Sequence, residues 1–491
     1  MKFLPFGTCL VFERLPDSPA GARAFLAQLY PLIAFNDGRL VGDCAVTLSL
    51  GPGGLSRLGL PNSALETFPF AFLEGMTGGN RTRILGDHDT NDPKYWRWGR
   101  GECDMSLLVY GKTQPAVAAL ELAITGYAEA VGLAPPHSIP LSQVTDDKRE
   151  PFGFVDGISQ PVIRGTYKSL RGADPIHLVE PGEFILGYPD NRGNLPPGPV
   201  IAAIEDPQNL LPLAVRSNGF DRNNAPALRD LGCNGSFLVI RELEQDKGAF
   251  DAYCDSEAAR LQARLAPPYR IDRAFIAAKM LGRWPDGSSL VRHPYEPRSA
   301  NSGLQHDTIR PKAVTSDNAS PVEPPAHSAQ AGRMPFGDND YLFGTEDPEA
   351  IRCPFGAHVR RANPRDSLSP GSADQIAISN RHRILRVGRN YEPKQDQNPG
   401  LLFMCLNGDI ERQFEFLQQT WLRSPVFHGL SCERDPILGD AQTGTCGYTI
   451  PSRDGPVSLK PVPQFVTVRG GGYFFLPSKR LLEYLMGLND G

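Results

Sequence analysis

The sequence predicts an α+β protein made of two ferredoxin-like domains, with antiparallel sheets and peripheral helices. In the first half, strand-like and helix-like runs follow one another as βαβ and then βαβ again, and the second half repeats this order. That order is typical of a ferredoxin-like unit. With 491 residues, the chain is also too long for one ordinary domain. Its apolar fraction of 40% and charged fraction of 21% are typical of a globular protein.

The first half contains short apolar runs suited to strands and two longer runs with apolar residues at helical spacing. The turn sequence Gly51-Pro-Gly-Gly54 predicts a reversal after the second strand. The expected strands are 8–13, 43–50, 105–110 and 139–144, and the expected helices are 20–34 and 115–132.

The second half repeats this order of elements without obvious repetition of the sequence. Its end predicts a hairpin that closes across Gly470-Gly-Gly472, followed by a helix that Ser478 caps. The expected strands are 236–243, 383–387, 401–406, 464–468 and 473–476, and the expected helices are 249–265, 271–281, 410–421 and 479–486.

Two stretches rich in turn-forming and polar residues set the expected organisation. The stretch 187–224 joins the halves, so we divide the chain into an N-terminal domain of residues 1–205 and a C-terminal domain of residues 206–491. The stretch 299–337 lacks any apolar period and predicts a long surface excursion. Its histidines, His306 and His327, are expected to have no special role.

Charge and cysteine usage restrict the class of protein. The net charge of -5 does not favour a nucleic acid or an anionic membrane as partner. The nine cysteines have no CxxC spacing and suggest neither a disulfide framework nor a zinc site, so we expect a reducing cytoplasm. No apolar run approaches the length of a membrane span. The cysteines expected to be small buried hydrophobes are Cys9, Cys44, Cys233 and Cys405.

The segment Cys353-Pro-Phe-Gly-Ala-His358-Val-Arg-Arg-Ala-Asn-Pro-Arg365 combines one imidazole with three arginines. A neutral imidazole binds iron through one ring nitrogen, and nearby arginines pair with carboxylates such as haem propionates. The segment therefore predicts an iron ligand at His358. The alternative is a structural histidine on a basic, solvated loop.

Two further segments carry groups suited to proton transfer and charge stabilisation. Asp156 stands among apolar residues in Gly153-Phe-Val-Asp-Gly157, so we expect desolvation to disfavour its charged form and to suit it to shuttling a proton. An ordinary Asp-Gly turn is the alternative. Alternation in 383–387 predicts a strand that holds Arg386, and a fixed arginine stabilises charge developing on a bound oxygen. The alternative is a surface arginine at a strand edge.

Together these segments resemble the dye-decolorizing peroxidases, a family of haem enzymes. Gly153-Phe-Val-Asp-Gly157 matches that family's GxxDG motif, 353–365 resembles its proximal haem-ligand segment, and 382–391 resembles its distal-arginine segment. The length and the 299–337 excursion resemble the larger bacterial and fungal members. Further similarity follows in the expected order in Phe237-Leu-Val-Ile-Arg-Glu-Leu-Glu-Gln-Asp246, Lys279-Met-Leu-Gly-Arg-Trp284, Gly400-Leu-Leu-Phe403 and Gly472-Tyr-Phe-Phe-Leu-Pro477.

The resemblance implies a fold of the dimeric α+β barrel type, with one haem b held mainly by the second domain. It implies a peroxidase that reduces hydrogen peroxide and oxidises small aromatic donors, such as phenols and dyes, by one-electron steps. The implied site residues are His358 as proximal iron ligand, Asp156 and Arg386 on the opposite peroxide-binding face, Arg365 beside a haem propionate, and Leu401 and Phe403 in the distal cavity.

Several points stay open in the sequence. A carboxylate is expected on the other ring nitrogen of the proximal histidine. Asp435 resembles the family's segment, while Glu411 and Glu415 are rivals and Asp435 as a turn residue is an alternative. Trp421 and Tyr391 are either electron relays or core aromatics.

The sequence leaves the assembly and one competing function undecided. The chain is a monomer or a homo-oligomer. The alternative function is a haem-binding or haem-handling protein without physiological peroxidase activity. It needs an iron ligand but neither Asp156 nor Arg386.

Overall fold

The structure, a computed structural model, describes residues 4–35, 40–101, 103–144, 148–166, 169, 175–214, 227–262, 271–301, 338–369, 372–392, 398–439 and 447–488. Residues 302–337, which include His306 and His327 and most of the predicted excursion, lie outside the described residues. Within the described ranges, no helix is both long enough and apolar enough to cross a membrane.

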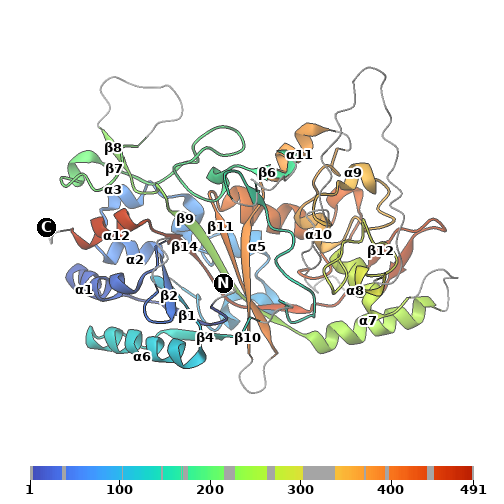
Figure 1. Ribbon diagram of the computed structural model, residues 1–491, viewed down its shortest axis with the longest axis horizontal. Helices are drawn as coiled ribbons and strands as arrows, with labels where there is room; N and C mark the ends of the chain where they lie inside the picture. The colour runs from blue at the N-terminus through green and yellow to red at the C-terminus, as the bar shows by residue number, and fades with distance from the viewer. Residues whose placement is uncertain are drawn as a thin grey trace.

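The central feature is a closed barrel in which neighbouring strands pair antiparallel, in the order β1-β3-β2-β14-β9-β11-β10-β4. Helices lie on both sides of it (Figure 1). The barrel strands are β1 (Phe6–Phe12), β2 (Cys44–Leu50), β3 (Met105–Gly111), β4 (His137–Leu141), β9 (Ser236–Gln245), β10 (Leu385–Tyr391), β11 (Gly400–Asn407) and β14 (Val466–Leu476).

The barrel consists of two sheets with the same strand order. The first half of the chain forms β4-β1-β3-β2 and the second half forms β14-β9-β11-β10, so each sheet runs fourth, first, third, second. This is the ferredoxin-like arrangement. The sheets meet at Phe475 opposite Leu50 and at Tyr391 opposite Leu141. The predicted α+β class with two ferredoxin-like units is confirmed, while the division at 205/206 stays a prediction.

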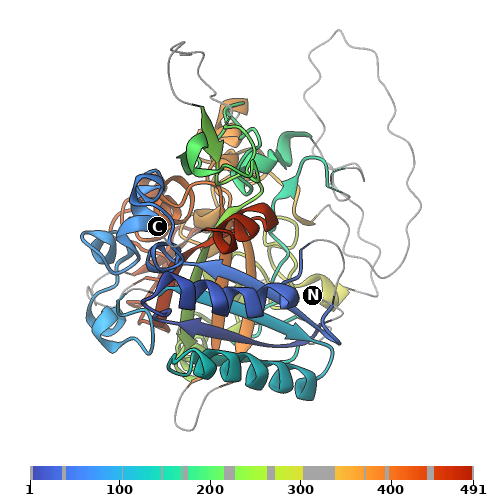
Figure 2. The ribbon, with the colours of Figure 1, turned by 90° about the vertical axis from the view of Figure 1, so that its left-hand side faces the viewer.

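Helices cover the outer faces of both sheets. Figure 2 shows α1 and α6 in front of the first sheet. Side chains cap α1, α6 and α12, since Ser18, Thr113 and Ser478 each accept a hydrogen bond from a backbone N–H in the first turn, and the cap predicted at Ser478 is confirmed. The helices are α1 (Pro19–Leu29), α2 (Pro52–Arg57), α3 (Asn62–Leu65), α4 (Phe70–Glu74), α5 (Arg81–Leu85), α6 (Gln114–Ala130), α7 (Lys247–Gln262), α8 (Arg273–Leu281), α9 (Phe343–Glu346), α10 (His358–Ala362), α11 (Ala373–Asn380) and α12 (Lys479–Met486).

Smaller elements complete the described chain. They include the two-stranded pairs β5 (Val162–Ile163) with β6 (Leu178–Val179), β7 (Val200–Ala202) with β8 (Leu228–Asp230), and β12 (Tyr448–Ile450) with β13 (Val457–Leu459), together with the π-helical segments Glu411–Glu415 and Leu417–Leu422. The helix expected at 410–421 is therefore wound as π-helix.

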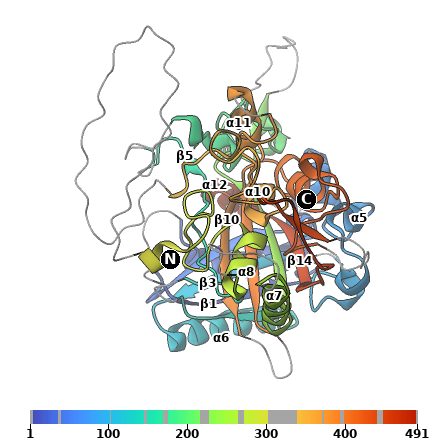
Figure 3. The same ribbon diagram turned by 90° about the vertical axis from the view of Figure 1, so that its right-hand side faces the viewer.

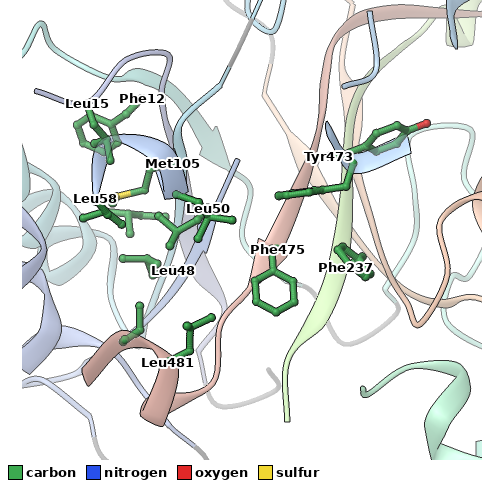
Figure 4. Packing of buried hydrophobic residues seen from close by; sticks show 14 of the residues in the cluster. Phe12, Leu15, Leu48, Leu50, Leu58, Met105, Phe237, Tyr473, Phe475 and Leu481 are labelled. Carbon is green, nitrogen blue, oxygen red and sulfur yellow. The ribbon is translucent and has the colours of Figure 1, made fainter. Parts of the chain in front are cut away.

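The apolar core has two main layers, because successive residues of each barrel strand face opposite sides. Inside the barrel, Leu238, Ile240 and Met404 pack with residues of the first sheet. Outside it, Leu48 and Phe475 pack with the covering helices (Figure 4). This alternation sends Arg241 and Leu243 of β9 outward, toward the covering helices of the second half.

Three predictions from the sequence are wrong. Two concern glycines that allow close packing, and the third concerns the first residue of a strand. The predicted turn at Gly51–Gly54 is instead the start of α2. A β-carbon at Gly51 would lie 1.9 Å from the Cys103 carbonyl oxygen, and a β-carbon at Gly54 would meet a neighbouring atom at a similarly short distance. The predicted hairpin at Gly470 is one continuous strand, β14, with a bulge beside the Trp98 indole. β10 begins at Leu385 rather than at residue 383.

The cysteines depart from expectation at two places. Cys9, Cys44 and Cys405 are buried free thiols as predicted, but Cys233 is half-exposed. Cys432 is disulfide-bonded, although the cysteine spacing suggested no disulfide framework. The cysteine argument for a reducing cytoplasm is therefore weakened.

Candidate active site

A cavity lies between the outer face of the second sheet and the helices that cover it. Figure 3 shows α8 and α10 in front of β10 on this side of the molecule. The sheet side comprises Arg241, Leu243 and Gln245 of β9, Arg386 of β10, Leu401 and Phe403 of β11, and Val466 and Val468 of β14. The covering side comprises Leu281, His358, Val359, Ala362, Leu417, Leu422, Ile437 and Leu438, and the segment 150–159 adds Glu150, Phe152, Phe154, Asp156 and Ser159. Apolar walls with a few polar groups are typical of a ligand site.

His358 is the first residue of α10 and contributes its imidazole to the covering side. Its Nδ1 lies 2.9 Å from Oδ2 of Asp435, whose side chain is fully buried. The other oxygen of Asp435 accepts hydrogen bonds from the backbone N–H groups of Ile437 and Leu438. The Nε2 atom of His358 is therefore the ring nitrogen left for a ligand in the cavity.

The charge state of Asp435 follows from this geometry. Burial by itself raises the pKa of Asp435, but the charge of His358 and the hydrogen bond to it outweigh burial and hold the pKa below its ordinary value. The rival carboxylates lie elsewhere, because Glu411 and Glu415 both pair with Arg81. Of these three carboxylates, only Asp435 contacts His358.

Two buried arginines fix the short helix that carries His358. Arg360 donates to Asp347 and to the Cys353 carbonyl oxygen. Arg361 donates to backbone carbonyls of the neighbouring segment 421–424 and to that of Glu433. Since Glu433 is close in sequence to Asp435, Arg361 ties the helix of the histidine to the loop of its carboxylate.

Asp156 and Arg386 form an ion pair on the sheet side. Arg386 Nη1 donates to Asp156 Oδ1 at 2.7 Å, and the backbone N–H of Gly157 donates to the same oxygen at 2.6 Å. Burial raises the pKa of Asp156, but the charge of Arg386 and its hydrogen bond prevail and lower the pKa below its ordinary value. The expectation that desolvation would disfavour the charged form is therefore wrong, because it omitted this guanidinium.

Leu401 and Phe403 project from alternate positions of β11 into the cavity, as alternation requires. Gly388 of β10 keeps the space beside them open. A β-carbon there would lie 3.0 Å from both Asp156 Oδ2 and Leu401 Cδ1. The apolar pair and the acid therefore converge on one part of the cavity.

Arg365 lies behind the cavity wall rather than in it. Its Nη atoms donate to the carbonyl oxygens of Asn339 and Tyr341 and to the Asn339 side chain. Arg283 and Arg383 do line the cavity, and both hydrogen-bond Ser159. Among the described residues, no carboxylate lies within ion-pair distance of these three guanidinium groups.

Arg283 and Arg383 were not among the site residues expected from the sequence, whereas Arg365 was. Burial, together with the charges of Arg365 and Arg386, lowers the pKa of Arg383 to about 9. Such a buried group stays cationic at neutral pH but gains from an anionic partner. The sequence did contain a signal for them, because Arg283 lies in the segment 279–284 and Arg383 in the segment 382–391, both of which resemble segments of the family.

The aromatic residues considered as relays are both buried. Trp421 is 5% exposed and packs against Phe416 and His382. Tyr391 is 4% exposed and belongs to the cluster inside the barrel. Their packing is that of core aromatics.

If His358 holds haem iron, as the resemblance implies, replacing Asp435 by Asn is expected to weaken haem retention about 10- to 100-fold, because the carboxylate orients the imidazole and raises its basicity. The measurement is the rate of haem transfer to excess apomyoglobin. Glu415→Gln is the matched control, since that carboxylate is equally buried but bonds Arg81 and Tyr473. Equal transfer rates for the two variants would contradict the assignment.

Comparison with known proteins finds similar sequences among the dye peroxidases. No protein-family model matches the chain. The multifunctional dye peroxidase DyP2 of Amycolatopsis sp. is 29% identical over 70% of this chain and 62% of its own length. The dye-decolorizing peroxidase AauDyP1 of Auricularia auricula-judae is 28% identical over 67% of this chain and 54% of its own length. The chain therefore spans less than two thirds of these relatives.

Solved structures show the same fold. The peroxidase crystal structure from Auricularia auricula-judae superposes with a TM-score of 0.70, covering 99% of this chain and 96% of that one at 20% identity. An ancestral D-type dye-decolorizing peroxidase gives a TM-score of 0.68 at 24% identity, over 99% and 97%. The resemblance inferred from the three segments is confirmed: this chain is similar to the dye-decolorizing peroxidases in sequence and in fold.

Proposed function

We propose that the protein is a haem-dependent peroxidase that reduces hydrogen peroxide and oxidises small aromatic donors such as dyes and phenols by one-electron steps. The observation that supports this most is the cavity itself. It combines a carboxylate-bound histidine on the covering side with an ion pair of Asp156 and Arg386 on the sheet side.

The donor set suits one haem b. The imidazole of His358 offers a single axial nitrogen, and the walls around it are largely apolar. Within the described ranges, no cluster of three or more His, Cys, Asp or Glu side chains could hold a metal ion without such a group. The cationic corner of Arg283 and Arg383 suits the propionates, with Arg365 adding its charge from behind.

Haem held by His358 would supply an iron that binds and polarises peroxide. Asp156 is ionised at neutral pH, so it accepts the proton of the inner peroxide oxygen and returns it to the outer one. Arg386 stabilises the negative charge that develops as the oxygen–oxygen bond breaks. Leu401 and Phe403 exclude bulk water from this step. The departing oxygen leaves as water; the haem would supply the two electrons that this needs, and two one-electron aromatic donors would return them.

The direct test of the function is an absorption spectrum of the purified protein before and after one equivalent of hydrogen peroxide. A haem band that changes on peroxide addition and returns after a phenolic donor is added is the expected result. A protein that binds haem but shows no change would favour haem handling instead. A protein that stays colourless after expression with added haemin would contradict both.

The cationic corner gives a separate prediction. Arg383→Met is expected to speed haem transfer to apomyoglobin roughly 10-fold, because a charge-assisted hydrogen bond to a carboxylate is worth about 1.5–3 kcal/mol. Arg389→Met is the matched control, since Arg389 is a buried arginine six residues further along, on β10, that bonds Pro5 and does not line the cavity. Loss of haem to the same extent in both variants would contradict a propionate site at Arg383.

A further inference from the structure

The acid of the site belongs to a segment that crosses the second sheet. We call residues 150–160 the strap. It begins beside β9 and ends beside β10, which are the two neighbours of β11 in the sheet. Asp156 stands between the two ends. Since no strand or helix forms within the strap, other contacts have to fix its position.

The first end of the strap is held at Glu150. Its carboxylate accepts the backbone N–H of Phe152 at 3.0 Å and that of Phe154 at 2.9 Å, and it accepts the side-chain amide of Gln245 at 2.8 Å. Gln245 is the last residue of β9. These hydrogen bonds join Glu150 to two later residues of the strap and attach this end of the strap to the sheet.

The second end is held at Gln160 by an unusual arrangement. Its Nε2 donates to the backbone carbonyl oxygen of Arg386, and its Oε1 accepts the backbone N–H of Arg386 at 3.3 Å. Among the described residues, β10 pairs with β4 only at Tyr391, so the edge of β10 at Arg386 has no strand partner there. The glutamine amide takes the place of the missing peptide group.

Arg386 is consequently held at two points by the same segment. Its guanidinium binds Asp156, and its backbone binds Gln160, which is only four residues further along. We propose that Gln160 is a positioning residue of the peroxidase reaction, which sets where the Asp156 carboxylate stands relative to the Arg386 guanidinium. This inference rests on the proposed function of that pair.

The physical reason is that proton transfer and charge stabilisation depend steeply on geometry, so that a displacement of about 1 Å costs up to 100-fold in rate. Without the Gln160 contacts, the strap keeps the backbone bonds of Val155 and Asp156, the bonds of Arg283 and Arg383 to Ser159, and the ion pair. It then loses its direct attachment to the backbone of Arg386, which is the contact that relates Asp156 to the strand carrying the guanidinium. The reaction with peroxide should suffer, while haem retention at His358, on the covering side, should not.

The test replaces Gln160 by methionine, which has a similar volume but no amide. Gln160→Met is expected to lower the second-order rate of reaction with hydrogen peroxide about 10-fold at unchanged haem content. Gln160→Glu keeps the acceptor oxygen but loses the N–H donor, so its rate should lie between those of the wild type and Gln160→Met. Gln262→Met, which removes a side-chain contact to the backbone N–H of Ile271 far from the cavity, is the control and should react at the wild-type rate.

A double-mutant cycle separates positioning from general stability. In an Asp156→Asn background, Gln160→Met should have almost no further effect, because its partner is already removed. The second readout is amide hydrogen exchange in the peptide around Arg386, which should become faster in Gln160→Met with and without haem. The overall melting temperature should match that of Gln262→Met.

A pH profile gives a third readout. The charged groups that act on Asp156 are Arg386 from β10, His358 from α10 and Glu150 from the strap. A loosened ion pair raises the pKa of Asp156. In Gln160→Met, the rate of the reaction with peroxide should therefore begin to fall at a higher pH as the solution is acidified.

Two results would overturn the inference. One is a Gln160→Met variant within twofold of wild type. The other is the same fold-loss with Asp156 present and absent. An Asp156→Asn variant that itself reacts normally would instead contradict the proposed function.

Discussion

Replacing His358 by alanine is expected to abolish haem binding, leaving less than about a tenth of the haem content of the wild-type protein. The imidazole is the one axial nitrogen that the described cavity offers, and its Nδ1 is already fixed by Asp435. The measurement is the ratio of haem absorbance to protein absorbance after purification with added haemin. Melting temperature of the haem-free forms shows that the variant folds.

The control for this variant is His137→Ala, since His137 lies on β4 outside the cavity. It should retain haem at the wild-type ratio. In His358→Gly, added imidazole should restore the haem spectrum, because the small molecule can occupy the space of the missing ring. Full haem content in His358→Ala, or no rescue by imidazole together with normal folding, would remove His358 from the iron site.

Replacing Asp156 by Asn is expected to slow the reaction with hydrogen peroxide by 100- to 10,000-fold, with haem content unchanged. General acid–base catalysis is worth this much when the proton acceptor is lost. Arg386→Leu should slow the same step by about 100- to 1,000-fold, the typical cost of removing one charge-stabilising donor. Stopped-flow absorbance with varied peroxide measures both.

The pH dependence adds a check on the pair. Arg386 holds the pKa of Asp156 below its ordinary value, so the wild-type rate should stay level down to acidic pH. In Arg386→Leu, the pKa of Asp156 loses this effect and burial raises it, so the acid limb should appear at higher pH. Asp190→Asn, a buried carboxylate that pairs with Arg192 away from the cavity, is the control. An unchanged peroxide rate in both active-site variants would favour haem handling.

The order of elements could be predicted because each strand of the barrel is a short apolar run and each long helix has an apolar stripe. The prediction from the sequence was wrong at two glycines. Gly54 and Gly470 were interpreted as turns, whereas both allow a close approach, by the Asp104 carbonyl oxygen in one case and the Trp98 indole in the other. Glycine tolerates both roles, and only the neighbour in space distinguishes them.

The candidate site could be predicted only as far as single segments. The sequence singled out His358, Asp156 and Arg386, and the resemblance implied one face for the last two, but it could not say that the Arg386 guanidinium bonds the Asp156 carboxylate and reverses its pKa shift. Nor could it decide between Asp435 and its rivals, because the hydrogen bond joins residues that are 77 positions apart. The cations Arg283 and Arg383 were not identified from the sequence, because only the packing of the described residues shows that neither has a carboxylate partner.

The central claim is that iron binds between His358 on one side and the pair of Asp156 and Arg386 on the other. A crystal structure of the haem-loaded protein tests it most directly. The account predicts density for a porphyrin in the cavity, with its iron within bonding distance of His358 Nε2 and both side chains of the pair over the opposite face. Iron bound to another residue, or the pair on the histidine side of the ring, would contradict it.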